Sequence, residues 1–396
     1  MASISRLKSF SNYIFTMGIK YSDFVDYRKL DSLKKMALEI FEPTLKYPER
    51  LGLRLLPESL GQTAPIFEPV GIKDSDFLIV GPNVEGLGTK NLVADCMYSE
   101  IVEKKRIAEN LDVKKLYRCI GQDTAAMSVN DVLAVGADPY VYCDIIACGK
   151  ASWFDDLERT RELLLGYRQA ADIGQFAIPQ GETPELPGIV NSETLDLAGA
   201  SCGLVRPKSR YITGEKIEEG DIIYGLASSG IHANGLSKAR KIAEKLPEGF
   251  FTELSNGKTL GEELLTPTHI YSRLVMELFE FIDIHFLQPI TGHGWKKIMR
   301  ARKPFTYVIE NVPEPPLIFQ ELIEFGKKYG FDVSDFENYQ VWNMGVGYII
   351  IGPKFDVDAI RKVVRRKSNI EVYELGYVKK GEKQVIIKPK NIVYKD

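Results

Sequence analysis

Apolar residues along the chain follow two periods, every second position in short segments and every third or fourth position in longer ones. The first period is that of a half-buried strand, and the second is that of an amphipathic helix. In the first half this pattern predicts a helix over 31–41, strands over 77–80, 140–147 and 176–178, a helix that ends near 136, a helix over 155–171 and an apolar segment over 195–205. In the second half it predicts strands over 221–227, near 307, over 348–351 and near 372 and 385, and helices from 236, from 266, over 316–328 and over 357–366. Two successive series of alternating strands and helices predict two α/β domains.

The polar, turn-rich segment 206–220 separates the two series. Domain boundaries usually fall in segments of this kind. We therefore expect a first domain over 21–206 and a second over 207–396. Residues 1–20 contain serines and basic residues but no acidic residue. They weakly resemble an organellar presequence, and a plain N-terminal extension is the simpler interpretation.

The composition is that of an ordinary globular protein, with 44% hydrophobic and 27% charged residues. Lys and Arg total 51 against 54 Asp and Glu, which gives a net charge of -3. This balance argues against general binding to nucleic acid or to an anionic membrane, so any anion site must be local. The sequence contains no run of 18 apolar residues, the length that a membrane-spanning helix needs. The five cysteines form no C-x-x-C pair, which suits a reducing compartment without structural zinc, and we expect a cytoplasmic protein.

The segment 119–139 places carboxylates in a helix that otherwise consists of small and apolar residues. Asp123 and Asn130 fall on one helical face, and Asp131 lies beside them. An ionised carboxylate in such surroundings costs several kcal/mol unless a cation, a donor or water meets it. One interpretation is a metal and phosphate site. The other, of equal weight from this segment alone, is that Asp123 caps the helix start while Asn130 and Asp131 emerge on a hydrated edge.

A glycine-rich turn, EGLGTK, follows the strand over 77–80. Gly86 and Gly88 let backbone N–H groups approach phosphate oxygens, and Thr89 and Lys90 add a hydroxyl and a cation. The spacing is not that of a Walker A loop, and a tight turn at a strand end is the simpler interpretation of this motif alone. Glu85 beside such a turn favours a divalent cation between carboxylate and phosphate.

Two further turns carry candidate ligands. The rigid loop 179–188 presents Glu182 and Glu185 at a predicted strand end, where α/β folds often place ligand chemistry, although an exposed acidic turn would look the same. The turn 226–235 precedes a predicted helix, which makes it either an anion site or a capped turn with one satisfied histidine. Its candidate ligands are Ser228, Ser229, His232 and Asn234. The glycine turns at 289–297 and 342–347 are uninformative by themselves.

Taken in order, these motifs resemble those of the phosphoribosylformylglycinamidine cyclo-ligase family, the aminoimidazole ribonucleotide synthetases. The matching segments are EGLGTK, AMSVNDVLAVGADP, QGETPELPG, SSGIHANGLS, LLTPTHIY, TGHG and WNMGVG, which lie in the family's order between Tyr21 and Tyr377. The fold alone would not identify the substrate, because selenophosphate synthetase and thiamine-monophosphate kinase belong to the same superfamily.

The resemblance implies a two-domain α/β (α+β) fold whose N-terminal domain pairs with a second copy in a homodimer. It implies that ATP phosphorylates the formamide oxygen of formylglycinamidine ribonucleotide, and that the amidine nitrogen then closes the ring as phosphate leaves. It further implies a set of site residues, with ATP and Mg²⁺ as cofactors and a ribonucleotide as substrate. These residues are Glu85, Asp131 and Glu182 as metal ligands; Asp131, Glu182 and Asn130 in catalysis; Gly86, Gly88, Thr89, Lys90, Asp123 and Thr183 at the nucleotide; and Ser228, Ser229, His232 and Asn234 at the ribonucleotide phosphate.

The chain departs from the family pattern at several positions. Glu85 replaces the usual Asp, Gln180 and Pro184 replace Gly and Ala, and His293 replaces the central Gly of T-G-G-G. Near the N-terminus, 21–26 departs from Y-x-x-A-G-V-D, and a different segment replaces the glycine-rich stretch that covers ATP. Two alternatives therefore stay open, a related ATP-dependent synthetase or kinase with another substrate, and a non-catalytic nucleotide-binding paralogue. Selenophosphate chemistry is disfavoured because no cysteine precedes Cys96.

Overall fold

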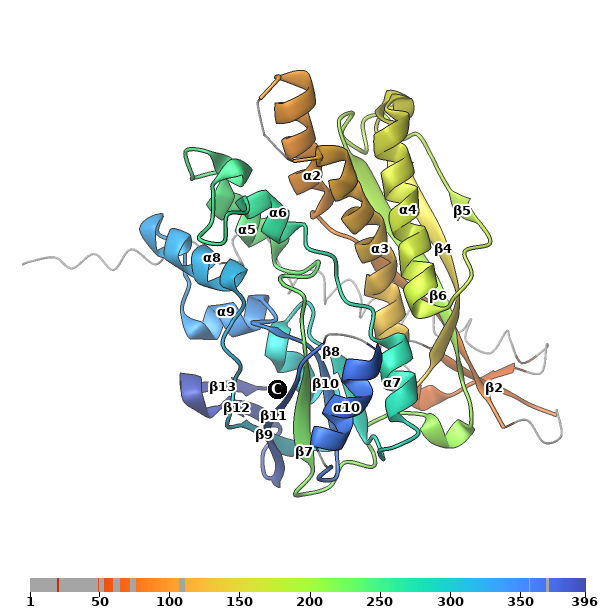
Figure 1. The fold of residues 1–396 in the computed structure, drawn as a ribbon. Coiled ribbons are helices and arrows are strands. Elements are labelled where there is room, and N and C mark those ends of the chain that lie inside the picture. Colours follow the sequence, from red (N-terminus) through yellow and green to blue (C-terminus); the bar gives the residue numbers. More distant parts are fainter. Residues whose placement is uncertain are drawn as a thin grey trace, which may run out of the picture.

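The computed structural model describes residues 20, 49, 53–59, 65–71, 76–106, 111–355, 357–367 and 370–396. The predicted helix over 31–41, the departure at 21–26 and nearly all of the extension over 1–20 lie outside these residues. The described residues form two sheets with helices packed against them (Figure 1). The change from one sheet to the other falls between Val205 and Ile222.

The first half of the chain forms a six-stranded sheet in the order β1-β2-β3-β6-β4-β5. Its strands are β1 (Leu53–Leu55), β2 (Ile66–Pro69), β3 (Leu78–Gly86), β4 (Asp138–Cys148), β5 (Gly181–Glu182) and β6 (Leu195–Val205). β3 and β4 flank β6 in antiparallel register, and the short β5 pairs in parallel with β4 at the sheet edge. Residues on β6 alternate between buried and half-exposed, so this sheet buries one face against the helices.

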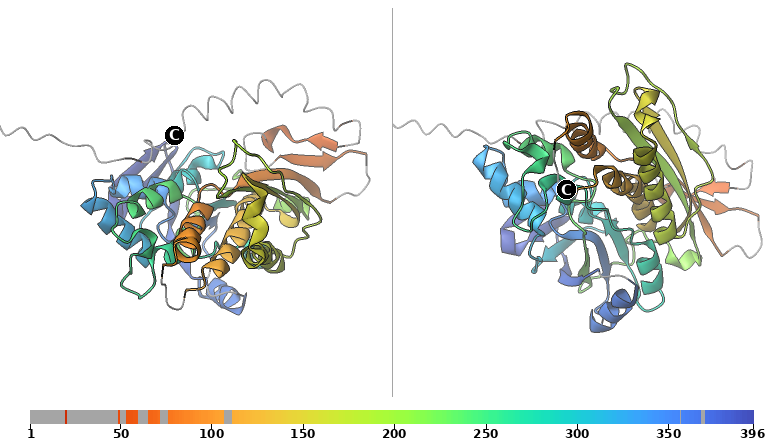
Figure 2. Two further views of the ribbon diagram at one scale, coloured as in Figure 1. Left: turned by 90° about the horizontal axis from the view of Figure 1, so that it is seen from above. Right: turned by 45° about the horizontal axis from the view of Figure 1, so that its top comes forward.

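Two long helices cover that buried face, α3 (Leu116–Leu133) and α4 (Leu157–Gly174) (Figure 2). They approach closely because each presents a glycine to the other, Gly121 on α3 and Gly166 on α4. The short helix α2 (Asn91–Tyr98) continues into the turn 99–103 and lies beside the start of α3. α3 is buried almost all round, as expected of a helix between a sheet and a second domain.

The second half forms a seven-stranded sheet in the order β13-β12-β9-β11-β7-β10-β8. Its strands are β7 (Ile222–Ala227), β8 (Phe286–Pro289), β9 (Phe305–Ile309), β10 (Val346–Gly352), β11 (Val372–Lys380), β12 (Gln384–Ile387) and β13 (Ile392–Lys395). Its helices are α5 (Leu236–Ala243), α6 (Leu260–Leu264), α7 (Ser272–Leu278), α8 (Leu317–Lys328), α9 (Asp335–Val341) and α10 (Val357–Lys367), with the 3-10 helix η10 (Gly294–Arg300) after β8. The strand β10, which lies between β7 and the edge strand β8, is buried along its whole length.

Three sequence predictions about elements are wrong. α3 begins at Leu116, so Asp123 lies in mid-helix and does not cap its start. The helix predicted from Thr266 begins at Ser272, and residues 266–271 belong to no helix or strand. The strand predicted over 176–178 is reduced to a single bridge between Ala177 and Val141.

The other predicted strands and helices of the described residues are present, with shifted ends. Within those residues no helix has both the length and the apolar character needed to cross a membrane.

Candidate active site

Two carboxyl groups meet where β3 ends beside α3. Glu85 points from β3 toward the helices, because it pairs with Gly199 on the inward face, and its carboxyl group lies close enough to that of Asp131 for the two to interact. Burial and the neighbouring Asp131 carboxylate raise the pKa of Glu85 to about 7. Burial also raises the pKa of Asp131. Two neighbouring carboxylates, one buried and one half-buried, need a proton or a cation to offset their mutual repulsion.

The second domain supplies the positive charge beside this pair. Lys297 and Arg300, both on η10, lower the pKa of Glu85 and of Asp131 and so offset part of the effect of burial. Lys297 is buried and its ammonium donates to Thr291 Oγ1. The Tyr348 hydroxyl donates to the carbonyl of Asn130 at 3.1 Å, and Tyr348 pairs with Pro289, two residues before Thr291. These contacts hold the start of η10 against the Asn130–Asp131 turn of α3.

The carboxyl pair fits the chemistry of a magnesium site. Among the residues that the structure describes, no three His, Cys, Asp or Glu side chains are grouped so as to hold a metal ion. Mg²⁺ nevertheless needs only one or two protein carboxylates when the phosphates of a nucleotide complete its octahedral shell. Glu85 and Asp131 would hold it, and the ion would neutralise negative charge on the phosphates of a bound nucleotide.

Glu182 and Thr183 are not brought to this pair within one chain. Both are exposed. Glu182 on β5 pairs with Ile145 on β4, and Ile145 pairs with Ala198, so Glu182 belongs to the face of the sheet opposite to that of Glu85. β3 and β5 are also three strand spacings apart, or roughly 14 Å.

Polar side chains of α3 bind the backbone of the segment 266–271, which belongs to the second domain. Gln122 Nε2 donates to Thr268 O at 2.9 Å, and the Thr268 N–H donates to Asp123 Oδ1 at 2.6 Å. Asn130 Nδ2 donates to His269 O at 2.7 Å, and the Tyr271 N–H donates to Asn130 Oδ1 at 3.0 Å. We call Gln122, Asp123 and Asn130 the α3 clasp. The clasp places Asp123 and Asn130 at the domain boundary, where they satisfy backbone groups.

Lys90 joins the same boundary. Its ammonium donates to Asp123 Oδ2, to His232 O at 2.8 Å and to Thr266 O at 2.8 Å. The side chains of Lys90 and Asp123 are both 0% exposed. Burial alone would lower the pKa of Lys90, but the Asp123 carboxylate outweighs it and raises that pKa. The lysine predicted to meet ATP phosphates is therefore fully enclosed by protein groups.

The turn over 228–235 is held together by its own polar residues. The Ser228 hydroxyl donates to Asn343 Oδ1 at 2.9 Å, and Asn343 Nδ2 donates to Gly230 O at 2.8 Å. The Ser229 N–H donates to His232 Nε2 at 3.2 Å, and the Ser229 hydroxyl donates to Pro267 O. Burial, together with His269 and Lys90, lowers the pKa of His232 well below its ordinary value, so this imidazole is neutral. Asn234 Nδ2 is buried and has no hydrogen-bond partner among the described residues.

The turn after β3 stays open to a ligand. Gly86 and Gly88 are exposed and Thr89 is half-buried, and Gly88 has the left-handed backbone that favours glycine. α2 starts directly after this turn at Asn91, whose side chain donates to Thr194 Oγ1 at 2.9 Å and to Leu195 O at 2.7 Å. The backbone of this turn is therefore fixed at its C-terminal end while its surface is accessible.

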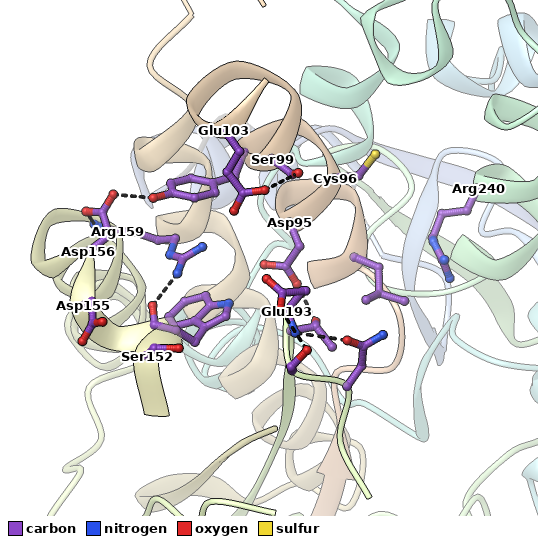
Figure 3. A pocket seen from close by; sticks show the side chains of 16 residues that line it. Asp95, Cys96, Ser99, Glu103, Ser152, Asp155, Asp156, Arg159, Glu193 and Arg240 are labelled. Carbon is purple, nitrogen blue, oxygen red and sulfur yellow. Dashed lines mark hydrogen bonds between the residues drawn. The ribbon is translucent and has the colours of Figure 1, made fainter. Parts of the chain in front are cut away.

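A cavity of about 530 Å³ lies along α2, beyond Asn91 (Figure 3). Its inner wall holds Asp95, which accepts hydrogen bonds from Thr194 and from the Tyr117 hydroxyl. The guanidinium of Arg159 is clamped between the rings of Tyr98 and Trp153, at 4.1 and 3.9 Å from their centroids. Because these groups contact one another, the wall of this cavity fixes α2 against the rest of the first domain.

Comparison with known proteins agrees with the motif order. A family model described as AIR synthase related protein, N-terminal domain, matches residues 94–205, and the corresponding C-terminal domain model matches residues 218–388. A phosphoribosylformylglycinamidine cyclo-ligase of Clostridium acetobutylicum is 37% identical over 333 residues, which cover 83% of this chain and 90% of that protein. One of Clostridium botulinum is 34% identical over 362 residues, which cover 91% of this chain and 95% of that protein. The chain belongs to the phosphoribosylformylglycinamidine cyclo-ligase family.

Membership of the cyclo-ligase family confirms the predicted enzyme class, a ligase, and the predicted fold. The thiamine-monophosphate kinase of Stenotrophomonas maltophilia K279a shares that fold, with a TM-score of 0.55, 16% identity and coverage of 88% of this chain and 94% of that chain. AaThiL in complex with AMPPCP and TMP is equally similar, with a TM-score of 0.55, 13% identity and coverage of 96% and 98%. At these identities the likeness shows the fold alone.

Sequence reasoning missed three residues at the site of this cyclo-ligase family member. Lys297 and Arg300 follow a glycine turn that carried no signal by itself, and Asn343 lies within another, the turn over 342–347. Their role depends on long-range packing of η10 against α3 and of the 342–347 turn against Ser228. The run of two lysines and an arginine after Gly294 could have indicated a cationic patch beside the acidic turn.

Proposed function

We propose that this protein converts formylglycinamidine ribonucleotide and ATP into aminoimidazole ribonucleotide, ADP and phosphate, in purine biosynthesis. The observation that carries the proposal is the Glu85–Asp131 carboxyl pair of the first domain, which faces Lys297 and Arg300 of the second domain. Phosphoryl transfer depends mainly on positioning and charge neutralisation, and this group of residues supplies both. Cyclo-ligase relatives that match over most of both chains support the choice of substrate.

In the proposed reaction the formamide oxygen attacks the γ-phosphorus of ATP, and the bond from that phosphorus to the β,γ-bridging oxygen breaks to release ADP. The amidine nitrogen then attacks the carbon that bears the new phosphate ester. The ring closes, the carbon–oxygen bond breaks, and phosphate leaves with the former formamide oxygen. Lys297 and Arg300 would stabilise the negative charge on the transferred group. Gly86, Gly88 and Thr89 would contact the phosphates of ATP, and Ser228, Ser229 and Asn234 would line the ribonucleotide side.

We further propose that the protein works as a homodimer through the uncovered face of its first sheet. No described helix lies over that face (Figure 2). It presents Val84, Tyr140 and Ile145, which are 64%, 50% and 42% exposed. An apolar surface shared by neighbouring strands is typical of an isologous interface between two copies. Glu182 lies on the same face, so a homodimer would place it at the interface.

The test is turnover by the purified protein with ATP, Mg²⁺ and formylglycinamidine ribonucleotide. The quantities measured are the ADP released and the aminoimidazole ribonucleotide formed. Asp131→Asn is expected to keep the fold and to lower kcat by on the order of 100-fold or more, because a charge needed at the phosphoryl group is lost. Asp196→Asn, which removes an exposed carboxylate at the start of β6, serves as the control. ATP binding by the wild-type protein without product would instead support a non-catalytic paralogue, and turnover of a different acceptor would support a related kinase.

A further inference from the structure

We propose that Lys90 is a positioning residue and does not bind ATP. It acts as a strut, which means that it fixes the distance between the turn Gly86–Thr89, proposed to bind ATP, and the turn over 228–235, proposed to bind the ribonucleotide phosphate. This inference rests on the proposed function, because it concerns how the two substrates of that reaction are aligned. Lys90 directly follows the open turn at Gly86–Thr89, and one of its acceptors, His232, lies in the turn over 228–235.

The hydrogen bonds of Lys90 leave no donor for a phosphate. A lysine ammonium has three N–H donors and no acceptor. Its three acceptors here are Asp123 Oδ2, His232 O and Thr266 O. The side chain is also 0% exposed. For Lys90 to reach ATP, a buried charge would have to give up one of these bonds, which is unfavourable because the acceptor left behind would be buried without a partner.

The acceptors of Lys90 come from both domains. Asp123 lies on α3, whereas His232 lies in the turn over 228–235 and Thr266 in the segment 266–271, both in the second domain. The His232 carbonyl is presented by a left-handed backbone conformation, with φ at +59°. His232 also accepts the Ser229 N–H through its ring, so the same residue connects Lys90 to the serine turn. One ammonium thus joins the first domain to two segments of the second domain, the turn over 228–235 and the segment 266–271.

The first domain holds the other side of Lys90 equally firmly. The next residue, Asn91, bonds to Thr194 and to the first carbonyl of β6, and Asp95 one helical turn later accepts from Thr194 and Tyr117. Figure 3 shows Asp95 and Arg159 lining the wall of the cavity along this helix. α2 therefore cannot shift without breaking several buried polar contacts. Movement of Lys90 would change the spacing between the two turns.

The reaction is sensitive to this spacing. A nucleophile and a phosphoryl group must lie about 3–3.5 Å apart and in line, and a displacement of about 1 Å can lower the rate by on the order of 100-fold. A strut would affect kcat while each substrate still binds to its own turn. A phosphate ligand would affect ATP binding itself. The two roles therefore predict different measurements.

The first measurement uses the wild-type protein labelled with ¹⁵N-lysine, in which the buried Lys90 ammonium should give a slowly exchanging NMR signal. Addition of a non-hydrolysable ATP analogue with Mg²⁺ is expected to leave this signal in place, because the ammonium keeps its three protein acceptors. A large shift of the signal, or its loss to fast exchange, would mean that the ammonium moves to the nucleotide and would overturn the proposal.

The second measurement uses the neutral pair Lys90→Met with Asp123→Asn. Replacing both partners leaves no buried charge without a partner, and the Asn can still accept the Thr268 N–H. Dissociation constants for ATP and for the ribonucleotide, each measured alone, should stay at the wild-type values, while kcat should fall by on the order of 100-fold. Loss of ATP affinity in step with kcat would identify Lys90 as a phosphate ligand, and an unchanged kcat would remove any role.

Lys238→Met is the matched control, because Lys238 is also fully buried but donates within the second domain, to Asp332 O. This control should leave kcat unchanged. If the double variant does not fold, the NMR measurement on the wild-type protein still decides between the two roles. If the wild-type protein makes no product, the proposed function fails, while the ammonium signal still reports whether Lys90 meets ATP.

Discussion

Glu85 shows how one methylene group changes a carboxylate pair. The cyclo-ligase pattern has Asp at this position, whose carboxyl group lies closer to its own strand. Glu85 reaches across to Asp131, and burial together with the Asp131 carboxylate raises the pKa of Glu85 to about 7. The longer side chain thus increases the need for a compensating cation at this place.

Replacing Lys297 tests whether the Glu85–Asp131 pair needs a positive charge beside it. Lys297→Met should lower kcat/KM by on the order of 100-fold, because it removes a fixed positive charge beside the transferring phosphoryl group. Lys296→Met is the matched control, since the neighbouring Lys296 carries the same charge but is only half-buried. Steady-state kinetics on both variants check the prediction. Equal losses would show that the effect is structural.

Single residues were predictable from the sequence only in part. The 3.6-residue period placed Asp123 and Asn130 on one helical face, and the structure shows that both bind the segment 266–271. Their partners lie more than 130 positions away along the chain, so no local pattern could reveal that they bind backbone groups rather than a ligand. Lys90 was assigned to phosphates for the same reason, since burial of a lysine after a glycine turn is a tertiary property.

At the scale of elements, α3 and α4 depend on their two facing glycines. A Cβ added at Gly166 would lie 2.1 Å from the Arg118 carbonyl oxygen, and one added at Gly121 would lie 2.1 Å from the Leu163 carbonyl oxygen. Gly166→Ala normally favours a helix by about 1 kcal/mol. Here the backbone clash should outweigh that gain and lower the free energy of unfolding by about 2 kcal/mol. Urea denaturation of the two proteins measures the difference, and an equal or higher stability would show that the helices can separate without cost.

The start of α4 offers a pH-dependent test. Burial would raise the pKa of Asp156, but hydrogen bonds from the Tyr98 hydroxyl, the Arg159 N–H and Lys114 lower it from 3.8 to about 2. Its side chain also caps α4 by accepting from Glu158 and Arg159. Asp156→Ala should therefore cost about 1 kcal/mol of stability at neutral pH.

The sign of the pH effect follows from the lowered pKa. The unfolded state binds the proton first, so the contribution of Asp156 is complete above about pH 5 and is lost as the pH falls toward about 2. The stability difference between wild type and Asp156→Ala should shrink over that range. Thermal unfolding at several pH values measures it, with Asp155→Ala, an exposed neighbour, as the control. A difference that stays constant with pH would mean that the cap does not depend on charge.

The elements themselves were largely predictable, because most have the periodicity of their class. β6 matches its predicted apolar segment at both ends, and α8 and α10 match within one residue. The main wrong prediction was the helix that was expected to begin at Thr266. Thr266-Pro267-Thr268 has the composition of a helix start, but its backbone groups are bound by the α3 clasp, so the helix begins only at Ser272. Short strands such as β8 and β13 lack enough residues to show a period.

At the scale of the whole molecule, the uncovered sheet face determines the proposed assembly. Ile145→Arg places a charge in the middle of that face and should shift the protein from dimer to monomer, because an apolar interface does not tolerate an unpaired charge. Sedimentation velocity at several concentrations measures the shift. Leu157→Arg is the control, since Leu157 is 78% exposed at the start of α4 and away from the sheet face. A dimer that persists in Ile145→Arg would place the interface elsewhere.

The α3 clasp also bears on how proteins of this kind can diverge. Asp123 and Asn130 are seven residues apart on a helix, about 10.5 Å, and between them they bind backbone groups of Thr268, His269 and Tyr271, so the spacing on α3 must match that of these backbone groups. A chimaera that joined the first half of one relative to the second half of another would inherit a working boundary only if both spacings were kept. α3 and the segment 266–271 must therefore be inherited as one unit.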